Sequence, residues 1–446
     1  MSATIEELLR DAKVELVVAR AEKDSTAISE IVKCLDSDIR SIRFNAALSL
    51  GELGEKASDC VSELVGCLDD NDWSICREAT KSLGKIGDAA VESIPKLSEL
   101  LGDDEVSIRK EAAIALGKIG VASDVAVLSL IKALDDKSEE IRTEAAKTLG
   151  DLGSGAHSAI PKLIDKLKDP QWTVRTAAAQ AIEGIGKGSA EAIPTLIGTL
   201  GDDDWRVRYR SVNTLVEIGK PAIPAIMEVI NHENPHIRKG AIEALGEMKV
   251  TDHELISAIG TLLKDKIEGV RGSAADALRS IGKDAIPTLI GSYDEANNKM
   301  KIIIISSIGG IGNNAVDAIP SLTEILQTGS NDVRAEAARS LGKIEVSDAS
   351  VIAALAEALT DKESSVRREA ALSLGKIGPA ASDAIPALID ALGDKKPDVR
   401  WRASEALGKI GVSDTNLIPV LEKMLYDEYD YVSEAAEEAI DSINLQ

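Results

Sequence analysis

At 446 residues with a formal net charge of −24, the chain is long enough for several globular domains and too acidic for a general nucleic-acid-binding protein. Aromatic residues make up only 2% of it, so the core must be built from Ala, Leu, Ile and Val, which suits short helices packed closely. All four cysteines lie in the first 76 residues without a C-x-x-C pair, which predicts free thiols in a reducing compartment.

The N-terminal residues predict a capping helix. Residues 4–20 place Ile5, Leu8, Leu9 and Leu16 at helical spacing, and we expect residues 1–22 to cover the open end of the structure that follows. The start of the chain is acidic and resembles no signal peptide. The longest aliphatic run, Ile302–Ile305, is far too short to cross a bilayer. We therefore expect a cytoplasmic protein without a membrane partner.

One segment recurs along the chain and defines its organisation. Val106–Gly120 has the sequence VSIRKEAAIALGKIG, and related segments follow at steps of 33 residues, with two steps of 30. Aligned on the arginine of this segment, here called the anchor, thirteen copies have the following anchors: Arg43, Cys76, Arg109, Arg142, Arg175, Arg208, Arg238, Arg271, Lys301, Arg334, Arg367, Arg400 and Ser433. A fixed period of this size predicts stacked repeats in which each unit buries its apolar face against the next.

Each repeat predicts two helices. The first is clearest at residues 192–200, and a proline such as Pro194 recurs in its first turn, where a missing N–H costs nothing. An acidic turn follows, with Asp six residues before the anchor, where it can cap N–H groups. The second helix is predicted to run from about the anchor to a Leu-Gly pair. The internal glycine, such as Gly117, indicates close helix approach, and the final glycine, such as Gly120, indicates a helix end.

The domain prediction is a single solenoid over residues 1–446. Repeats occupy 23–416, and residues 417–446 form a C-terminal cap because they are acidic and lack both the anchor Arg and the internal Gly. The two short repeats lose three residues from the turns after Gly219 and Gly282, which predicts a local change of curvature.

The consensus D-x(5)-R-x-x-A-A-x-x-L-G-x-[IL]-G followed by A-I-P-x-L resembles HEAT repeats of the short, phycobilisome-lyase-like type. The resemblance implies an all-α fold, a right-handed solenoid of about 13 antiparallel helix pairs whose second helices line a concave groove. It also implies a structural ladder of Asp and Arg between repeats, formed by Asp103, Arg109, Asp136, Arg142, Asp202, Arg208, Asp361 and Arg367. Such repeats serve mainly as scaffolds for a protein or peptide partner.

Positions one, two, five and nine after the anchor are predicted to face the groove. In the outer repeats these positions hold mainly charged residues. In the middle repeats they are less charged, and aromatic, Arg and amide side chains occur together there, as they do at binding hot spots. The candidate partner-binding residues are Trp172, Thr176, Trp205, Tyr209, Arg210 and Asn213, with Trp401 and Arg402 as a second group. The alternative is that the Trp rings only cover neighbouring repeats, because Trp73 has the same offset in an otherwise ordinary repeat.

Three other functions stay open, although we predict no catalytic residue, no metal and no cofactor. A bilin-lyase-like subunit would act on a tetrapyrrole–protein thioether. A di-iron enzyme like deoxyhypusine hydroxylase needs His-Glu pairs directly after the anchor, whereas the pairs His232–Glu233 and His253–Glu254 are predicted to lie in turns, and Pro235 argues against a helix shared by His232 and His236. A DNA-glycosylase-like enzyme needs a basic groove, whereas acidic and basic residues at the groove positions are about balanced.

Overall fold

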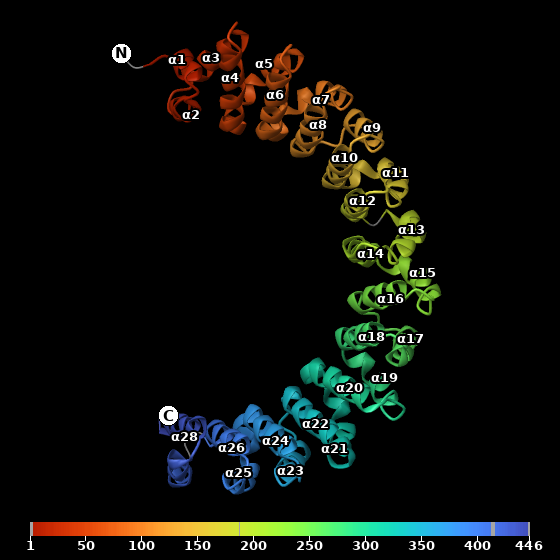
Figure 1. The fold of residues 1–446 in the computed structure, drawn as a ribbon, viewed down its shortest axis with the longest axis vertical. Coiled ribbons are helices and arrows are strands. Elements are labelled where there is room, and N and C mark those ends of the chain that lie inside the picture. The colour runs from red at the N-terminus through yellow and green to blue at the C-terminus, as the bar shows by residue number, and fades with distance from the viewer. Residues whose placement is uncertain (1–2, 187, 412–414, 445–446) are drawn as a thin grey trace. The chain divides into compact units, whose positions relative to one another are not determined.

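The computed structural model describes residues 3–186, 188–411 and 415–444, and every regular element in them is a helix. The chain divides into two compact units, Met1–Ala241 and Ile242–Gln446, and the division falls within helix α16 (Pro235–Glu247). Each unit is a stack of helix pairs, and in Figure 1 the first helices form one layer and the second helices the other. The predicted all-α solenoid of thirteen helix pairs is confirmed, whereas its right-handed twist stays a prediction.

In the N-terminal unit, seven helix pairs follow two short helices, α1 (Ile5–Arg10) and α2 (Val14–Ala21). The first helices of the pairs are α3 (Thr26–Lys33), α5 (Val61–Gly66), α7 (Ile94–Leu100), α9 (Asp124–Ala133), α11 (Ile160–Lys166), α13 (Ile193–Thr199) and α15 (Ile223–Glu228). The second helices are α4 (Arg40–Leu53), α6 (Trp73–Ile86), α8 (Val106–Ile119), α10 (Glu139–Asp151), α12 (Trp172–Ile185), α14 (Trp205–Ile218) and α16, which the two units share.

The C-terminal unit continues the pattern. Its first helices are α17 (His253–Thr261), α19 (Ile286–Gly291), α21 (Ile319–Thr328), α23 (Ala349–Ala358), α25 (Ile385–Ala391) and α27 (Ile418–Leu421). Its second helices are α18 (Glu268–Ile281), α20 (Asn298–Ile311), α22 (Asn331–Ile344), α24 (Ser364–Ile377), α26 (Pro397–Ile410) and α28 (Asp430–Asn444). Short 3-10 turns join many of these helices, and prolines stand in the first turns of eight first helices, as predicted: Pro95, Pro161, Pro194, Pro224, Pro287, Pro320, Pro386 and Pro419.

Two helix boundaries differ from the prediction. The single N-terminal helix over residues 4–20 is wrong, because Ala12 has a positive φ of 54° and the chain turns there, which lets both Leu9 and Val17 become fully buried. The second helices also begin three residues earlier than expected, at Trp172 and Trp205 in repeats five and six, so these residues are the first of their helices and do not lie on the preceding turns.

The second helices approach one another most closely at a glycine. A Cβ atom added to Gly84 would lie 2.9 Å from the Cα of Ala115, and one added to Gly150 would lie 2.8 Å from the Cα of Ala181. In each case the partner is the small residue six positions after the next anchor. Where that residue is Ser or Thr, its hydroxyl also donates to a backbone carbonyl of the preceding helix, as Thr148 does to Ala113 at 2.9 Å. The predicted close approach is confirmed at these contacts, and the hydroxyl bonds add to it.

The stretch Asn298–Thr328 is long and apolar enough to cross a membrane by length and composition alone. It contains α20, the 3-10 turn η10 (Gly312–Ala318) and α21, and Gly312 has a positive φ of 71° that ends α20. Met300, Ile304 and Ile308 of α20 are buried, as are Leu322 and Leu326 of α21. The stretch is therefore two helices of the stack joined by a turn.

We predict that Gly150→Ala lowers the free energy of unfolding by about 1–3 kcal/mol, because its methyl group would meet the backbone of Ala181. Gly198→Ala in α13 is the matched control, since a Cβ there meets nothing within 4 Å, and it should stabilise by about 0.5–1 kcal/mol through helix propensity. Urea denaturation followed by circular dichroism measures both. Equal effects of the two substitutions would contradict close packing at Gly150.

Candidate functional site

An exposed aromatic pair stands on α14 in the N-terminal unit. Trp205 is 64% exposed and Tyr209 55% exposed, although each is large and apolar. Their spacing of four residues places the two rings on one face of the helix, one turn apart. Two neighbouring exposed rings in a chain with 2% aromatic residues are unusual, because large apolar surfaces are normally buried.

Trp172 has a different environment from Trp205. The guanidinium of Arg206, in the next repeat, lies 3.3 Å from the centroid of its ring. Arg206 is held there by two hydrogen bonds to Asp204, at 2.7 and 3.0 Å, and these bonds lower the pKa of Asp204 to about 2. Trp172 therefore joins repeats five and six, as the alternative interpretation of the Trp residues proposed. Sequence analysis did not anticipate the role of Arg206.

The other central candidates lie beside these rings. Asn213 is partly exposed on α14, one turn after Tyr209. Arg210 lies 3.7 Å from a carboxylate oxygen of Glu183 on α12, an ion pair between repeats. The Oγ1 of Thr176 is buried and has no hydrogen-bond partner among the described residues, and the same holds for Thr173 on the same helix and for Thr143 on α10. Such hydroxyls normally find a partner, because leaving one unpaired costs about 1–3 kcal/mol.

The second candidate group takes part in packing at the last repeats. Trp401 makes an edge-to-face contact with Tyr431, their ring centroids 5.6 Å apart. The guanidinium of Arg402 lies 3.6 Å from the centroid of the Trp401 ring and also bonds to Glu405 at 2.6 Å. The Tyr431 hydroxyl donates to Asp398 at 3.0 Å. Trp401 thus contacts α28, whereas Arg402 bonds within α26 and lies over the Trp401 ring.

The anchor arginines connect successive repeats. Arg109 donates from Nε and Nη2 to the carboxylate of Asp136 in the next repeat, at 2.7 and 3.1 Å, and from Nη1 to the backbone carbonyl of Asp103 in its own repeat. Asp136 in turn accepts from the N–H of Ser138 at 2.7 Å, which fixes the acidic turn. The same carboxylate–arginine clamp is formed by Arg43 and Asp70, Arg142 and Asp169, Arg175 and Asp202, Arg334 and Asp361, Arg367 and Asp394, and Arg400 and Asp427.

Two residues of the predicted ladder, Asp103 and Arg208, form no such carboxylate–arginine clamp with any described residue. Among the described residues, no guanidinium bonds to the carboxylate of Asp103, because repeat two has Cys76 at its anchor. In the same part of the chain, Arg208 donates only to the backbone carbonyls of Asp202 and Asp203, since repeat seven has His232 where the acceptor Asp would stand. The ladder is therefore interrupted beside the exposed aromatic pair.

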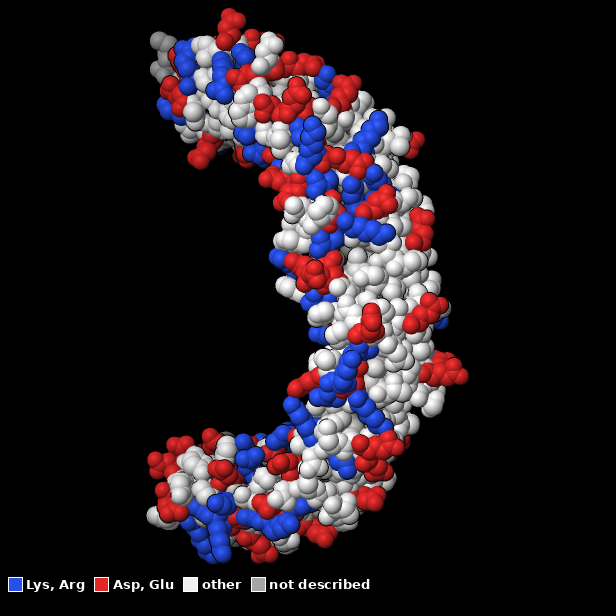
Figure 2. Space-filling model, turned by 45° about the vertical axis from the view of Figure 1, so that its right-hand side comes forward, with Lys and Arg blue, Asp and Glu red and all other residues white. Residues whose placement is uncertain are grey.

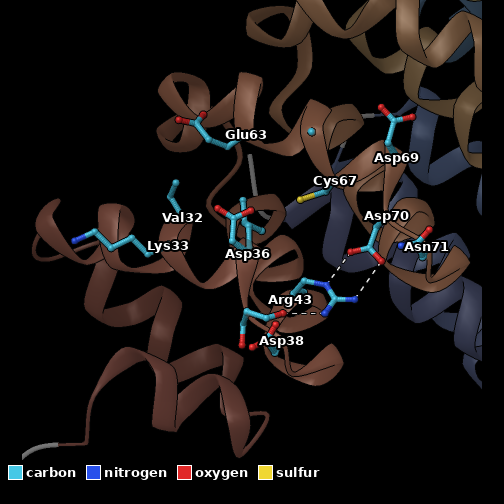
Figure 3. Close-up of a pocket in the computed structure, with 13 residues that line it drawn as sticks. Val32, Lys33, Asp36, Asp38, Arg43, Glu63, Cys67, Asp69, Asp70 and Asn71 are labelled. Carbon is cyan, nitrogen blue, oxygen red and sulfur yellow. Dashed lines mark hydrogen bonds and ion pairs between the residues drawn. The ribbon is translucent and has the colours of Figure 1, made fainter.

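Sequence analysis did not find a hollow of about 660 Å³ between the turns of the first two repeats. Figure 3 shows carboxylates of Asp36, Asp69 and Glu63 around it, with the Arg43–Asp70 ion pair forming one wall. The sulfur of the buried Cys67 points into it, and burial raises the pKa of that thiol to about 11. The neutral thiol and the acidic turns make this hollow unsuited to anions.

The two His-Glu pairs lie in different elements. His232 lies before α16, which begins at Pro235, and its Nδ1 accepts from the N–H of Asn234, so His232 and His236 share no helix, as predicted. His253 is the first residue of α17, so placing it in a turn was wrong. Within residues 3–186, 188–411 and 415–444, no group of three or more His, Cys, Asp or Glu side chains lies close enough together to hold a metal ion.

Stacked helix pairs at a regular spacing define the α-solenoid class of folds, and sequence comparison names the family. The model for HEAT repeats matches residues 28–117, 94–183, 160–230, 193–257, 223–309, 292–375 and 352–441. The chain therefore belongs to the HEAT-repeat family. No curated protein matches it.

Solved structures with the same fold include karyopherins. Kap121p bound to Pho4p is 14% identical with a TM-score of 0.58, and the match covers 99% of this chain and 53% of Kap121p. Kap95p, described for its binding to RanGDP, is 14% identical with a TM-score of 0.56, covering 95% and 67%. Importin beta is 13% identical with a TM-score of 0.55, covering 95% and 68%. The chain thus spans about half of Kap121p, and at these identities the likeness concerns the fold.

We predict that Arg142→Ala lowers the free energy of unfolding by about 3–5 kcal/mol, because it leaves Asp169 charged and unpaired with a side chain only 5% exposed. Arg10→Ala is the control, since the Arg10–Glu6 pair is more than half exposed on both sides and should contribute less than about 1 kcal/mol. Urea denaturation distinguishes the two, and similar losses would contradict a structural role for the ladder.

The same pair predicts a pH dependence. Burial acts to raise the pKa of Asp169, but hydrogen bonds from Arg142 and from the N–H of Gln171 outweigh it, and the net pKa is below the ordinary 3.8. A carboxyl with a lowered folded-state pKa stabilises the fold above its unfolded-state pKa and loses that contribution as the pH falls. The wild type should therefore lose stability below about pH 4, and Arg142→Ala should lose less over the same range.

Proposed function

We propose that this chain is a non-catalytic scaffold that binds a partner protein or peptide on the groove face of its second helices, with Trp205 and Tyr209 as anchors. The observation that supports it most is the exposure of these two rings side by side on α14. Aromatic side chains that are exposed in the free protein and buried in a complex are the commonest hot spots of protein interfaces.

The surroundings of the two rings favour a protein partner. Asn213 follows Tyr209 by one turn and can both donate to and accept from a peptide backbone. The groove positions of α12 are uncharged: Thr176, Ala177, Gln180 and Gly184. An uncharged surface with an amide suits the polar but neutral backbone of an extended segment.

Family membership and the similar structures support the same proposal. The HEAT-repeat matches extend from residue 28 to residue 441, and the similar solved structures include Kap121p bound to Pho4p and to the extreme C-terminus of the phosphatase Cdc14p. We propose that this chain shares with them the use of a helical stack as a binding surface. Its own partner is a separate question, because the identity is 14–15%.

We also propose a repeat subtype, a cellular location and a class of partner for this chain. The 33-residue period with its L-G-K-I-G ending supports the short, phycobilisome-lyase-like repeat subtype. The four cysteines, all buried free thiols, support a cytoplasmic location. The net charge of −24 supports a protein partner over a nucleic acid, and we propose that binding needs no cofactor.

Affinity purification from the source cells tests the proposal. We predict that Trp205→Ala/Tyr209→Ala removes specific proteins that the wild type retains, because truncating two hot-spot rings lowers affinity by about 2 kcal/mol or more, roughly 30-fold. Val125→Ala/Leu128→Ala on α9 is the matched control, since these residues are also exposed and apolar but lie on a first helix. Identical partner lists for all three proteins at equal folded yield would overturn the proposal.

A further inference from the structure

Three consecutive second helices of the C-terminal unit carry a row of lysines. Lys343 of α22, Lys376 of α24 and Lys409 of α26 stand at the same repeat position, nine residues after the anchor. Lys376 and Lys409 are exposed and Lys343 is partly exposed. Lys409 bonds to Glu405 on its own helix at 2.6 Å, whereas neither Lys343 nor Lys376 forms an ion pair with any described residue. Two of the three charges are therefore available to a partner.

Arginines on the same helices are held in place by buried carboxylates. Glu369 is 3% exposed and accepts from Nε and Nη2 of Arg339, both at 3.1 Å, and from Nη2 of Arg368 at 2.9 Å. Arg339 also bonds to the buried Glu336 at 2.7 Å. Both arginines nevertheless keep about two fifths of their side chains exposed. Their guanidinium groups are thus held by buried carboxylates, while part of each side chain stays exposed to solvent. Because the groups are already held in place, less entropy is lost when they bind an anion.

The balance of charge on these helices is opposite to that of the whole chain. Between each anchor and the helix end, α22, α24 and α26 carry six cations, namely Arg339, Lys343, Arg368, Lys376, Arg402 and Lys409, and only three carboxylates, Glu336, Glu369 and Glu405. The whole chain has a net charge of −24. Figure 2 shows blue and red side chains interspersed over the C-terminal unit. The same stretches of α6 and α8 also carry more cations than carboxylates, but there Lys81, Lys85 and Lys110 each form an ion pair with a carboxylate.

The lysine row is not a simple consequence of the repeat consensus. Lys85 and Lys118 occupy the same position in the N-terminal unit, but there the row reads Glu52, Lys85, Lys118 and Asp151, and Lys85 bonds to Glu52 at 2.6 Å. A lysine in the last turn favours the helix dipole by about 0.3–1 kcal/mol, which accounts for any single lysine. The helix dipole does not explain why three successive repeats all have lysine at this position, with no carboxylate at the same position among them.

We propose that the cationic face of α22, α24 and α26, defined by Lys343, Lys376, Lys409, Arg339 and Arg368, binds an Asp- and Glu-rich segment of a partner protein. A segment lying across three repeats would place successive carboxylates against successive lysines, and the two fixed arginines offer forked donors that match carboxylate geometry. The inference rests on the proposed protein-binding function but uses a surface separate from Trp205 and Tyr209.

A nucleic acid fits this face less well. On this face the cations outnumber the carboxylates by only three, and Glu336 and Glu369 lie directly beneath Arg339 and Arg368. The neighbouring α28, which packs against α26, carries Glu434 and Glu438 at its own groove positions. A regular polyphosphate backbone would meet these carboxylates, whereas a short acidic segment can end before them.

Fluorescence anisotropy with the full chain and a labelled twelve-residue peptide of alternating Glu and Ser tests the proposal. We expect binding that weakens when the salt is raised from about 0.05 to about 0.5 M, because exposed charges are screened. Lys343→Gln/Lys376→Gln should weaken it about five- to tenfold, and the single Lys376→Glu should do the same. The matched control Lys85→Gln/Lys118→Gln should bind as the wild type does.

Several outcomes would overturn the inference. They are an absence of binding by the wild type, an equal loss in the Lys85/Lys118 control, equal binding of a Lys-Ser peptide, and tighter binding of a single-stranded oligonucleotide of matched charge. Circular dichroism checks that each variant is folded. The Trp205→Ala/Tyr209→Ala variant should still bind the acidic peptide, so this inference and the proposed function can fail separately.

Discussion

The whole stack depends on how closely one second helix can approach the next. At Gly84 and Gly150 the approach leaves no room for even one methyl group, and the neighbour is always a small residue of the next repeat. Burial of the Ala, Leu, Ile and Val side chains follows from this contact, because short helices of small residues can exclude water only when they are near each other. The arginine clamp then fixes the turns at one end of the same helices. A repeat thus has two fixed points, and the residues between them are free to vary.

The sequence differs most from the repeat consensus where the internal glycine or the arginine clamp is missing. Glu183 and Val216 stand where the internal glycine would be in repeats five and six, and Arg208 lacks a carboxylate partner among the described residues. Repeats five and six are still joined by the Arg175–Asp202 clamp and by a bond from the Thr214 hydroxyl to the backbone carbonyl of Ala179. The Trp172–Arg206 stack and the Arg210–Glu183 ion pair add further contacts between them. Trp205 and Tyr209 are exposed in this region. Loss of the internal glycines and of the Arg208 clamp therefore coincides with the surface we propose for binding.

The fold was largely predictable because its information is repeated. A period of 33 residues, prolines in first turns and an internal glycine each recur many times, so the helix pairs follow from pattern alone. The N-terminal helix was mispredicted because it lies outside the repeat, where the turn at Ala12 has no second copy to reveal it. The candidate site was harder, since exposure depends on single neighbours. Trp172 and Trp205 share one offset, but only Trp172 is covered, because Arg206 of the next repeat bonds to Asp204 and lies over its ring. Likewise, the lysines of L-G-K-I-G look alike in sequence and differ only in what the adjacent repeats place beside them.

We infer that a partner contacts the chain where the repeats depart from their consensus. Site-specific photo-cross-linking tests it most directly, with a benzophenone side chain in place of Tyr209, Lys110 or Leu128 in separate proteins. Lys110 has the same repeat position as Tyr209 in a regular repeat, and Leu128 is 57% exposed on a first helix. We predict a discrete cross-linked partner from position 209 that is absent from 110 and 128. The same adducts from all three positions, or none from 209, would contradict the account.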